Sequence, residues 1–229
     1  MSTEPDAIKA RYARRMHVER YSLLRPDVWQ SVQERQRAML RLFADLGHTD
    51  LSALRLLEVG CGSGNNLLEF LRMGFAPQHL SGVELLSDRF QVARASLPSA
   101  LKLHEGDALT MNVTEQSQDI VFVSTVFSSL LDDAFQQCLA DAMWRWVKPG
   151  GGVLWYDFTV NNPRNSDVRG VPLKRVQALF PQGQIRSQRV TLAPPVARLV
   201  TRINPRLYGV FNAVWSLRTH CLVWIAKPA

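Results

Sequence analysis

From Leu54 onward the chain alternates short apolar runs with amphipathic stretches, and this pattern constrains the fold more than any other feature of the sequence. Short apolar runs bounded by turn residues are typical of strands that are buried on both faces. These runs lie at 54–59, 80–84, 100–104, 119–125 and 152–158. Helical patterns lie between them at 65–73, 87–96 and 133–147. The succession predicts a doubly wound, mostly parallel sheet with right-handed crossovers.

The segments before and after this alternating region have other patterns. Residues 1–50 have helical spacing, with a second helix opening at Pro26, and predict an N-terminal helical cap. Residues 51–229 predict one α/β domain, in which a helix at 172–180 precedes two last strands. We place these strands at 184–192 and 219–226. The stretch 193–218, interrupted at Asn204-Pro205, predicts a helical insert between them.

Composition supports an ordinary globular protein. The 229 residues are 46% hydrophobic and 21% charged, with no apolar leader and no run long enough to span a bilayer, so we expect a cytoplasmic location. Three scattered cysteines and five scattered histidines have no metal-ligand spacing, and we predict no metal site. The sequence gives no indication of the oligomeric state.

The net charge of +7 is unevenly distributed. Residues 51–160 hold seven basic and twelve acidic side chains, whereas residues 161–229 hold eleven basic and one acidic. The basic C-terminal third indicates either an anionic partner or a merely solvated face, and charge alone does not separate the two.

The strongest local signal is Leu57-Glu58-Val59-Gly60-Cys61-Gly62-Ser63-Gly64, a strand that runs into a glycine loop and opens a helix. Glycines allow positive φ and let a ligand touch the main chain, and the first amides of the helix then face that ligand. A dinucleotide fingerprint requires a third glycine where this chain has Asn65, and no triplet of a P-loop is present.

Two carboxylates follow at the ends of the next two strands. Glu84 comes 24 residues after Gly60, where an acidic side chain can accept both hydroxyls of a ribose; the alternative is an ordinary exposed glutamate. Asp107 follows the third strand, where a carboxylate can accept the exocyclic amine of an adenine.

Taken in this order, the pieces over residues 54–158 resemble the class I methyltransferases that depend on S-adenosylmethionine. The resemblance implies that Glu58 and the glycine loop hold the methionine end of the cofactor, that Glu84 binds its ribose and that Asp107 lies at its adenine. It also implies that the last two strands, at 184–192 and 219–226, form an antiparallel pair. It predicts the following cofactor-binding set: Glu58, Gly60, Cys61, Gly62, Gly64, Glu84, Leu85, Asp107, Ala108 and Ser124.

A narrower similarity covers 124–129 and 155–170. It looks like a group of small bacterial methyltransferases, many of unknown acceptor and some associated with polysaccharide or secondary-metabolite synthesis. In an open parallel sheet the pocket lies beyond the carboxyl ends of the strands, which predicts acceptor contacts there. Asp157 is the predicted base or acceptor-orienting group. The predicted substrate contacts are Thr125, Tyr156, Asn161, Arg164 and Arg169; a purely structural loop is the alternative for the last three.

We therefore expect an enzyme that methylates a small or anionic acceptor of the sugar, lipid-linked or secondary-metabolite class. A nucleic-acid acceptor is disfavoured, because Ser124-Thr125-Val126-Phe127 replaces the Asn/Asp-Pro-Pro-aromatic pattern of base methyltransferases. The alternatives are a dinucleotide-dependent oxidoreductase and a catalytically silent cofactor-binding scaffold. We interpret the insert at 193–218 as an acceptor lid or a weak membrane-surface contact; the alternative is two helices packed on the sheet edge.

Overall fold

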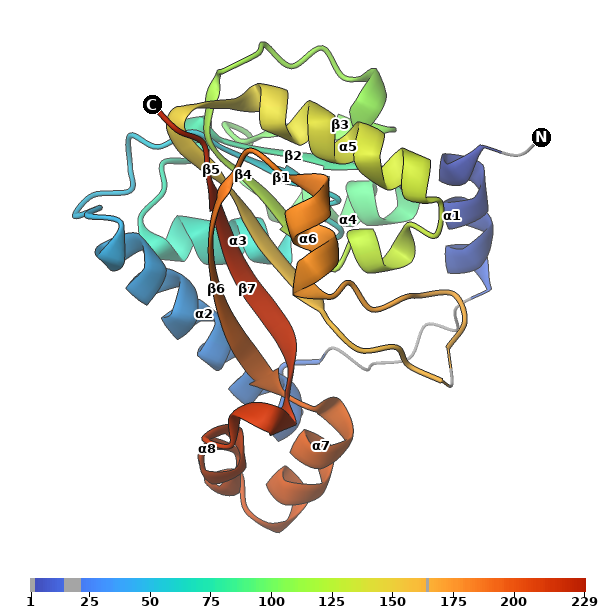
Figure 1. Cartoon of the computed structure of the whole chain (residues 1–229), viewed down its shortest axis with the longest axis vertical. Helices are drawn as coiled ribbons and strands as arrows, with labels where there is room; N and C mark the ends of the chain where they lie inside the picture. Colours follow the sequence, from blue (N-terminus) through green and yellow to red (C-terminus); the bar gives the residue numbers. More distant parts are fainter. Residues whose placement is uncertain (1–2, 15–21, 164) are drawn as a thin grey trace.

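A computed structural model describes residues 3–14, 22–163 and 165–229. Its centre is a seven-stranded sheet of order β3-β2-β1-β4-β5-β7-β6 (Figure 1). Neighbours among the first five strands in this order are parallel, whereas β7 runs antiparallel to both β5 and β6. The predicted fold class, a mostly parallel sheet with an antiparallel pair at one end, is confirmed. The strands are β1 (Leu56–Val59), β2 (Leu80–Glu84), β3 (Lys102–Glu105), β4 (Gln118–Ser124), β5 (Val147–Phe158), β6 (Gln184–Leu192) and β7 (Arg218–Ala226).

Helices cover both faces of this sheet and follow the predicted alternation. The α-helices are α1 (Glu4–Ala13), α2 (Pro26–Asp45), α3 (Asn65–Met73), α4 (Ser87–Ser96), α5 (Asp133–Trp146), α6 (Leu173–Leu179), α7 (Pro194–Ile203) and α8 (Leu207–Asn212). Four short 3₁₀ segments are η1 (Pro77–His79), η2 (Ala108–Thr110), η3 (Phe127–Ser129) and η4 (Trp215–Leu217). None of the described helices combines the length and the apolar character needed to cross a bilayer.

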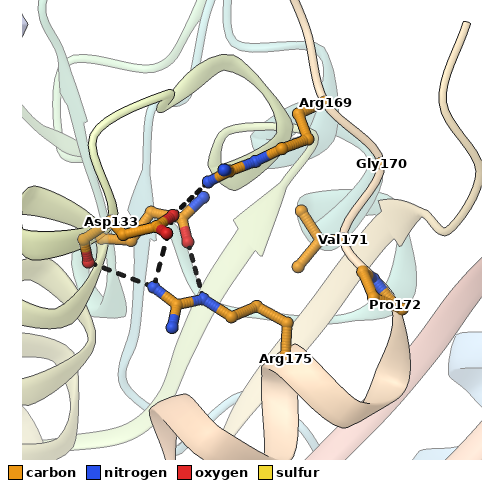
Figure 2. A pocket seen from close by; sticks show the side chains of 7 residues that line it. Asp133, Arg169, Gly170, Val171, Pro172 and Arg175 are labelled. Carbon is orange, nitrogen blue, oxygen red and sulfur yellow. Dashed lines mark hydrogen bonds and ion pairs between the residues drawn. The ribbon is translucent and has the colours of Figure 1, made fainter.

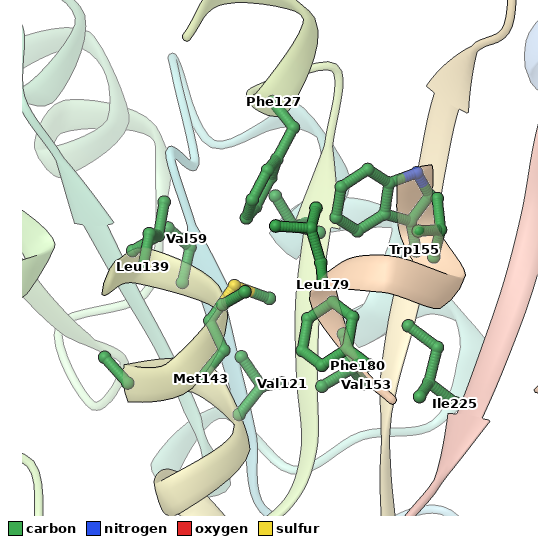
Figure 3. Close-up of a cluster of buried hydrophobic side chains, with 14 of the residues drawn as sticks. Val59, Val121, Phe127, Leu139, Met143, Val153, Trp155, Leu179, Phe180 and Ile225 are labelled. Carbon is green, nitrogen blue, oxygen red and sulfur yellow. The ribbon is translucent and has the colours of Figure 1, made fainter. Parts of the chain in front are cut away.

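The buried side chains form one layer on each face of the sheet, because consecutive residues of a strand point to opposite faces. One layer joins alternate residues of β1, β4 and β5 to α5 and α6, with Met143, Phe180 and Trp155 among its members (Figure 3). The other layer joins the remaining strand residues to α2, α3 and α4, with Phe43, Phe70 and Phe122 at its centre. Both faces are therefore apolar, as the continuous hydrophobic runs predict.

One predicted boundary was wrong. We expected the fifth strand to begin at residue 152, but β5 begins at Val147, which pairs with Gln118 of β4. The register then shifts, and Gly152 pairs with Ile120. The turn at 148–151 is therefore an irregularity inside the strand, which local sequence cannot distinguish from a turn that precedes it.

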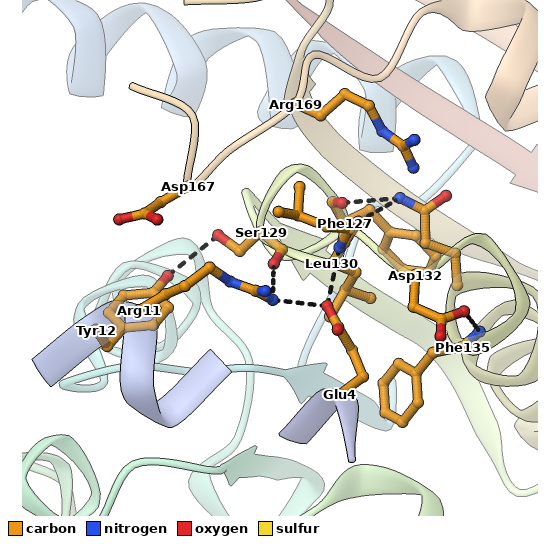
Figure 4. A network of polar contacts seen from close by, with 12 residues as sticks. Glu4, Arg11, Tyr12, Phe127, Ser129, Leu130, Asp132, Phe135, Asp167 and Arg169 are labelled. Atoms are coloured by element: carbon orange, nitrogen blue, oxygen red, sulfur yellow. Dashed lines mark hydrogen bonds and ion pairs between the residues drawn. The ribbon is translucent and has the colours of Figure 1, made fainter. Parts of the chain in front are cut away.

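The two N-terminal helices pack in different places. The first helix, α1, lies against η3, because Arg11 donates to the Ser129 carbonyl at 3.0 Å and Glu4 accepts the Leu131 amide at 2.9 Å (Figure 4). Its Tyr12 ring also lies 4.5 Å from the Arg89 guanidinium of α4. The second helix, α2, packs against β6 and α7.

The half-buried carboxylate of Glu34 ties α2 to the end of β6. Thr191 adopts φ +64°, which is unusual for a β-branched residue, and it is skipped in the pairing between β6 and β7. Its amide instead donates to both oxygens of Glu34 at 3.0 Å. Glu34 also accepts the Tyr208 hydroxyl of α8 at 2.7 Å. One side chain of α2 therefore holds both the end of β6 and the insert.

We expect Glu34→Ala to lower the free energy of unfolding by about 2–3 kcal/mol, because the Thr191 amide and the Tyr208 hydroxyl lose their shared acceptor. Urea unfolding measures this change. Glu115→Ala is the matched control, since its carboxylate is 68% exposed and pairs with Arg145 at 3.6 Å; we expect it to change stability by less than about 0.5 kcal/mol. Equal effects of the two substitutions would contradict the anchoring role of Glu34.

Candidate functional site

The glycine loop that follows β1 has the conformation that its sequence requires. Gly60, Gly62 and Gly64 all have positive φ, at +68°, +55° and +83°. A Cβ at Gly60 would lie 2.5 Å from Val126 Cγ2, and one at Gly64 would lie 2.7 Å from Leu97 Cδ1. A Cβ at Gly62 would meet no atom of the described chain within 4 Å. Packing therefore requires the first and third glycines, whereas the middle one faces open space.

Glu84 holds this loop from the end of β2. Its Oε2 accepts the Gly62 amide at 2.7 Å, and its Oε1 accepts the Leu86 amide at 2.9 Å. Only 5% of the residue is exposed, and burial raises the pKa of its carboxyl above the usual value. Glu84 is thus not an ordinary surface glutamate. Each oxygen has accepted one hydrogen bond and keeps further acceptor capacity.

Glu58 is fully buried at the base of the same loop. Its Oε1 accepts the Asn66 amide at 2.6 Å, while its Oε2 has no hydrogen-bond partner among the described residues. Burial raises the pKa of the Glu58 carboxyl to about 8. A buried carboxylate oxygen without a partner is unfavourable unless a cation or a donor reaches it.

Two residues that the sequence analysis missed surround Glu58. Asn66, in the first turn of α3, also accepts a hydrogen bond from Arg35 Nη2 at 2.7 Å, and Arg35 pairs with Glu69 at 3.2 Å. The Arg35 guanidinium additionally lies 5.1 Å from the Tyr156 ring. The polar Asn65-Asn66 pair at the helix start was a usable signal. No sequence signal indicated Arg35, because it lies on a helix about thirty residues upstream of Asn66.

The end of β3 lies beside the end of β2. Glu84 pairs with Glu105, and the Gly106 amide donates to the Glu84 carbonyl at 2.8 Å. Asp107 follows directly, half-buried, and its Oδ1 accepts the Leu109 amide at 3.0 Å as the cap of η2. Ala108 is buried and Leu85 packs against the same core. The two predicted nucleoside-binding carboxylates therefore occupy one edge of the sheet.

Ser124 and Thr125 end β4 next to the loop. Ser124 is buried, whereas Thr125 is exposed and adopts φ +54°, a strained conformation for a β-branched residue. The Thr125 amide donates to the Tyr156 carbonyl at 2.8 Å, which holds this strained residue against β5. Cys61 is buried, and burial raises the pKa of its thiol well above the usual range. A small buried thiol of this kind fills space and is not a nucleophile.

Tyr156 and Asp157 point to opposite faces of β5. The Tyr156 hydroxyl pairs with Thr191 Oγ1 at 2.8 Å, and its ring stacks on His220 at a centroid distance of 5.0 Å. Asp157 is 1% exposed; its carboxylate accepts the Ser128 amide at 3.0 Å and the Phe158 amide at 2.9 Å. Burial raises the pKa of Asp157 to about 7. Neither side chain is open to solvent.

The loop after β5 is held by its own polar side chains. Asn161 accepts the Gly170 amide at 2.8 Å, and the Arg169 amide donates to the Ser128 carbonyl at 2.8 Å. The Arg169 guanidinium pairs with Asp133 at the rim of a pocket of about 180 Å³ (Figure 2). The residues that line this pocket come from α5, α6 and the segment before α6, not from the glycine loop. Arg164 lies outside the described residues.

Among the residues that the structure describes, no group of His, Cys, Asp and Glu is arranged to hold a metal ion.

Comparison with known proteins identifies this arrangement. A family model described as a methyltransferase domain matches residues 56–151, the segment from β1 into β5 that contains the glycine loop, Glu84 and Asp107. The match covers less than half of the chain, and together with methyltransferase relatives and solved structures of the same fold it supports a class I S-adenosylmethionine-dependent methyltransferase. The resemblance stated from the sequence is thereby confirmed, and the cofactor of this family is S-adenosylmethionine.

Curated methyltransferases that match differ in their acceptors. A phthiotriol/phenolphthiotriol dimycocerosates methyltransferase of Mycobacterium ulcerans is 30% identical over 134 residues, which is 56% of this chain and 48% of the relative. A fatty-acid O-methyltransferase of Mycolicibacterium smegmatis is 31% identical over 54% of this chain and 44% of the relative. A tRNA N(3)-cytidine methyltransferase of Gallus gallus is 26% identical over 47% and 31%. The chain spans less than half the length of each.

Solved structures agree in fold. A methyltransferase from Archaeoglobus fulgidus superposes with a TM-score of 0.60 at 12% identity, covering 84% of this chain and 94% of that one. A protein whose structure is described as the [4+2]-cyclase SpnF superposes with a TM-score of 0.56 at 14% identity, covering 84% and 83%. The second example shows that this fold is not restricted to methyl transfer.

We expect Gly60→Ala to lower the free energy of unfolding by about 2–4 kcal/mol, because it adds a positive-φ penalty to a clash with Val126. Gly209→Ala on α8 is the matched control, since a Cβ there meets nothing within 4 Å; we expect it to be neutral or to stabilise by up to about 1 kcal/mol. Thermal and urea unfolding of both variants measure the difference. A Gly60→Ala protein as stable as the parent would show that the loop is more adaptable than its packing indicates.

Proposed function

We propose that this protein transfers a methyl group from S-adenosylmethionine to a small or anionic acceptor of the sugar, lipid-linked or secondary-metabolite class. The observation that carries the proposal is the partnerless, buried Oε2 of Glu58 at the base of a glycine loop whose middle residue faces open space. A ligand that brings a cationic amine to this loop satisfies both features, and the methionine end of the cofactor carries such an amine.

The residues present fit the rest of the cofactor as well. Glu84 is held in place by two amides and retains acceptor capacity for the ribose hydroxyls. Asp107 lies at the neighbouring strand end, where it can accept an adenine amine. Cys61, Leu85, Ala108 and Ser124 remain proposed contacts beside these groups. When bound, S-adenosylmethionine supplies an electrophilic methyl group on a sulfonium, and holding acceptor and donor in line is a large part of catalysis.

On the acceptor side, Thr125 is our first candidate contact. It is exposed at the end of β4 in a strained conformation, and strained residues of this kind cluster at functional sites. We propose that Asp157 orients the acceptor side through η3, because both of its oxygens already accept backbone amides. Tyr156, Asn161 and Arg169 each have a partner within the protein, and Arg164 is proposed from the sequence alone.

The N-terminal cap proposed for residues 1–50 covers the sheet edge at which the cofactor is proposed to bind. In that region α1 contacts both η3 and α4, which flank the glycine loop, and thereby bridges the two sides of the proposed cofactor site. Two matching relatives are named for lipid-like acceptors, which supports the lipid-linked member of the proposed class. The replacement of the base-methyltransferase pattern at 124–127 still argues against nucleic acid, although one relative is named for tRNA.

A thermal-shift comparison of S-adenosylhomocysteine with NAD tests the cofactor. A ligand at 100 times its dissociation constant stabilises by about 2.7 kcal/mol, which for this chain length is roughly 5–11 °C. We expect this shift with S-adenosylhomocysteine and none with NAD. A shift with NAD alone would instead support the oxidoreductase alternative.

Transfer of a labelled methyl group to extracted lipids and to sugars then tests the enzyme. Cofactor binding without transfer to any of these acceptors supports the silent-scaffold alternative.

We expect the affinity for S-adenosylhomocysteine to rise up to tenfold between pH 6 and pH 7, because Glu58, with a pKa of about 8, must lose its proton to meet the ligand amine. The affinity rises with pH because the pKa of Glu58 is raised: below about pH 8 its carboxyl is mostly protonated before the ligand binds. Each decrease of one pH unit then makes its deprotonation tenfold less favourable. Calorimetry in buffers of different ionisation enthalpy should also detect proton release.

Glu58→Gln should bind with a pH-independent affinity over the same range, because glutamine does not titrate. Glu115→Gln, on the exposed surface, is the control and should retain the dependence of the parent. If Glu58→Gln keeps the pH dependence of the parent, Glu58 does not contact the ligand. The assignment of the fold would not change.

A further inference from the structure

The helical insert exposes an unusually apolar outer face. We define the insert face as the exposed apolar side chains of α7, α8, η4 and the link between α8 and η4. Their exposed fractions are 63% for Leu199, 74% for Ile203, 64% for Val210, 38% for Phe211, 48% for Val214 and 67% for Trp215. Single exposed apolar residues are common on proteins, but a run of six within seventeen residues marks an interaction surface.

Packing against the rest of the protein does not use this face. The insert is anchored by its opposite side, where Ala197, Val200 and Tyr208 form a small core with Leu192. The Tyr208 hydroxyl is bonded to Glu34 of α2. Two helices packed on a sheet edge therefore account for the inner residues and leave the insert face unexplained.

Arginines surround the insert face, and no carboxylate accompanies them in this part of the sequence. Arg198, Arg202 and Arg206 are exposed on the same segment, and the Arg189 guanidinium lies 5.3 Å from the Trp215 ring. The sequence contains no Asp or Glu after Asp167. A segment with exposed aliphatic and aromatic side chains beside arginines is typical of helices that lie in the interface of a membrane.

The insert also lies at the functional edge of the sheet. It joins the end of β6 to the start of β7, and His220 of β7 pairs with Phe158 at the end of β5 (Figure 1). The turn before α2 exposes Leu24 at 94%, and α2, which packs on α7, exposes Trp29 at 43%. The surface is thus on the side of the molecule toward which the parallel strands point.

We propose that the insert face binds the surface of an anionic lipid membrane, with its apolar side chains in the headgroup boundary and its arginines on lipid phosphates. A second copy of the chain fits less well, because a two-fold contact through this face would oppose arginines to arginines. Nucleic acid fits less well too, because the aliphatic Leu199, Ile203 and Val210 have no role on a phosphate backbone.

Bound in this way, the protein would take its acceptor from the membrane, a consequence that rests on the methyl transfer proposed above. The membrane contact itself does not depend on that activity. Binding to vesicles and binding to S-adenosylhomocysteine can therefore fail separately, and each is measured in its own experiment.

Co-sedimentation of the full chain with vesicles tests the proposal. We expect binding at low salt to phosphatidylcholine vesicles that contain about one third phosphatidylglycerol, and weak binding to phosphatidylcholine alone. Ile203→Gln combined with Trp215→Gln should reduce the partition coefficient at least about tenfold, because the apolar contribution is lost. Arg198→Glu combined with Arg202→Glu should reduce it by about tenfold or more on anionic vesicles only.

Val92→Gln combined with Arg94→Glu is the matched control, because both residues are exposed on α4, which packs on β2 and β3 at the other end of the sheet. It should bind vesicles like the parent. Since all substituted side chains are exposed, we expect the free energy of unfolding and the thermal shift with S-adenosylhomocysteine to be unchanged in every variant.

Failure of the parent to bind anionic vesicles at low salt overturns the proposal, as does equal binding by the parent and the insert variants. A parent dimer that Ile203→Gln with Trp215→Gln converts to monomer would assign the face to a second copy instead.

Discussion

The hydrogen bond from the Gly62 amide to the Glu84 carboxylate is the contact on which the site depends. At 2.7 Å it joins the loop after β1 to the end of β2, so that two neighbouring parallel strands present their carboxyl ends as one surface. Because the carboxylate is nearly buried, its acceptor capacity is not saturated by solvent. The same side chain therefore positions the loop and remains available to a ligand, and positive φ at the glycines is what lets the loop approach it.

A second set of contacts connects this surface to the helical insert. From Glu58 it runs through Asn66 to Arg35, whose guanidinium lies over the Tyr156 ring. The Tyr156 hydroxyl meets Thr191, and Thr191 and the insert are both bonded to Glu34. Arg35 and Glu34 are adjacent on α2, so one helix touches both ends of this chain of contacts. The glycine loop and the insert are thus connected through polar contacts of α2.

The parallel part of the fold, and the sheet edge that carries the glycine loop, could be predicted from the sequence alone. Apolar runs separated by helical patterns leave few ways to bury both faces of each strand, and the spacing from the glycine loop to Glu84 and Asp107 places their side chains at adjacent strand ends. Local chemistry was sufficient there, because a strand end and the following loop are neighbours in sequence. The helical insert and its break at Asn204-Pro205 were readable for the same reason.

Which polar groups meet across distant segments depends on how the helices pack on the sheet. Arg35 reaches Asn66, Glu34 reaches Thr191, and Asp157 lies under Ser128, each over a separation that no local pattern encodes. Burial was equally hidden: Tyr156 and Asp157 sit at the predicted edge, yet both are enclosed because α2 and η3 pack over opposite faces of β5. A sequence specifies which side chains can form hydrogen bonds, whereas their partners are fixed by how helices cover the sheet.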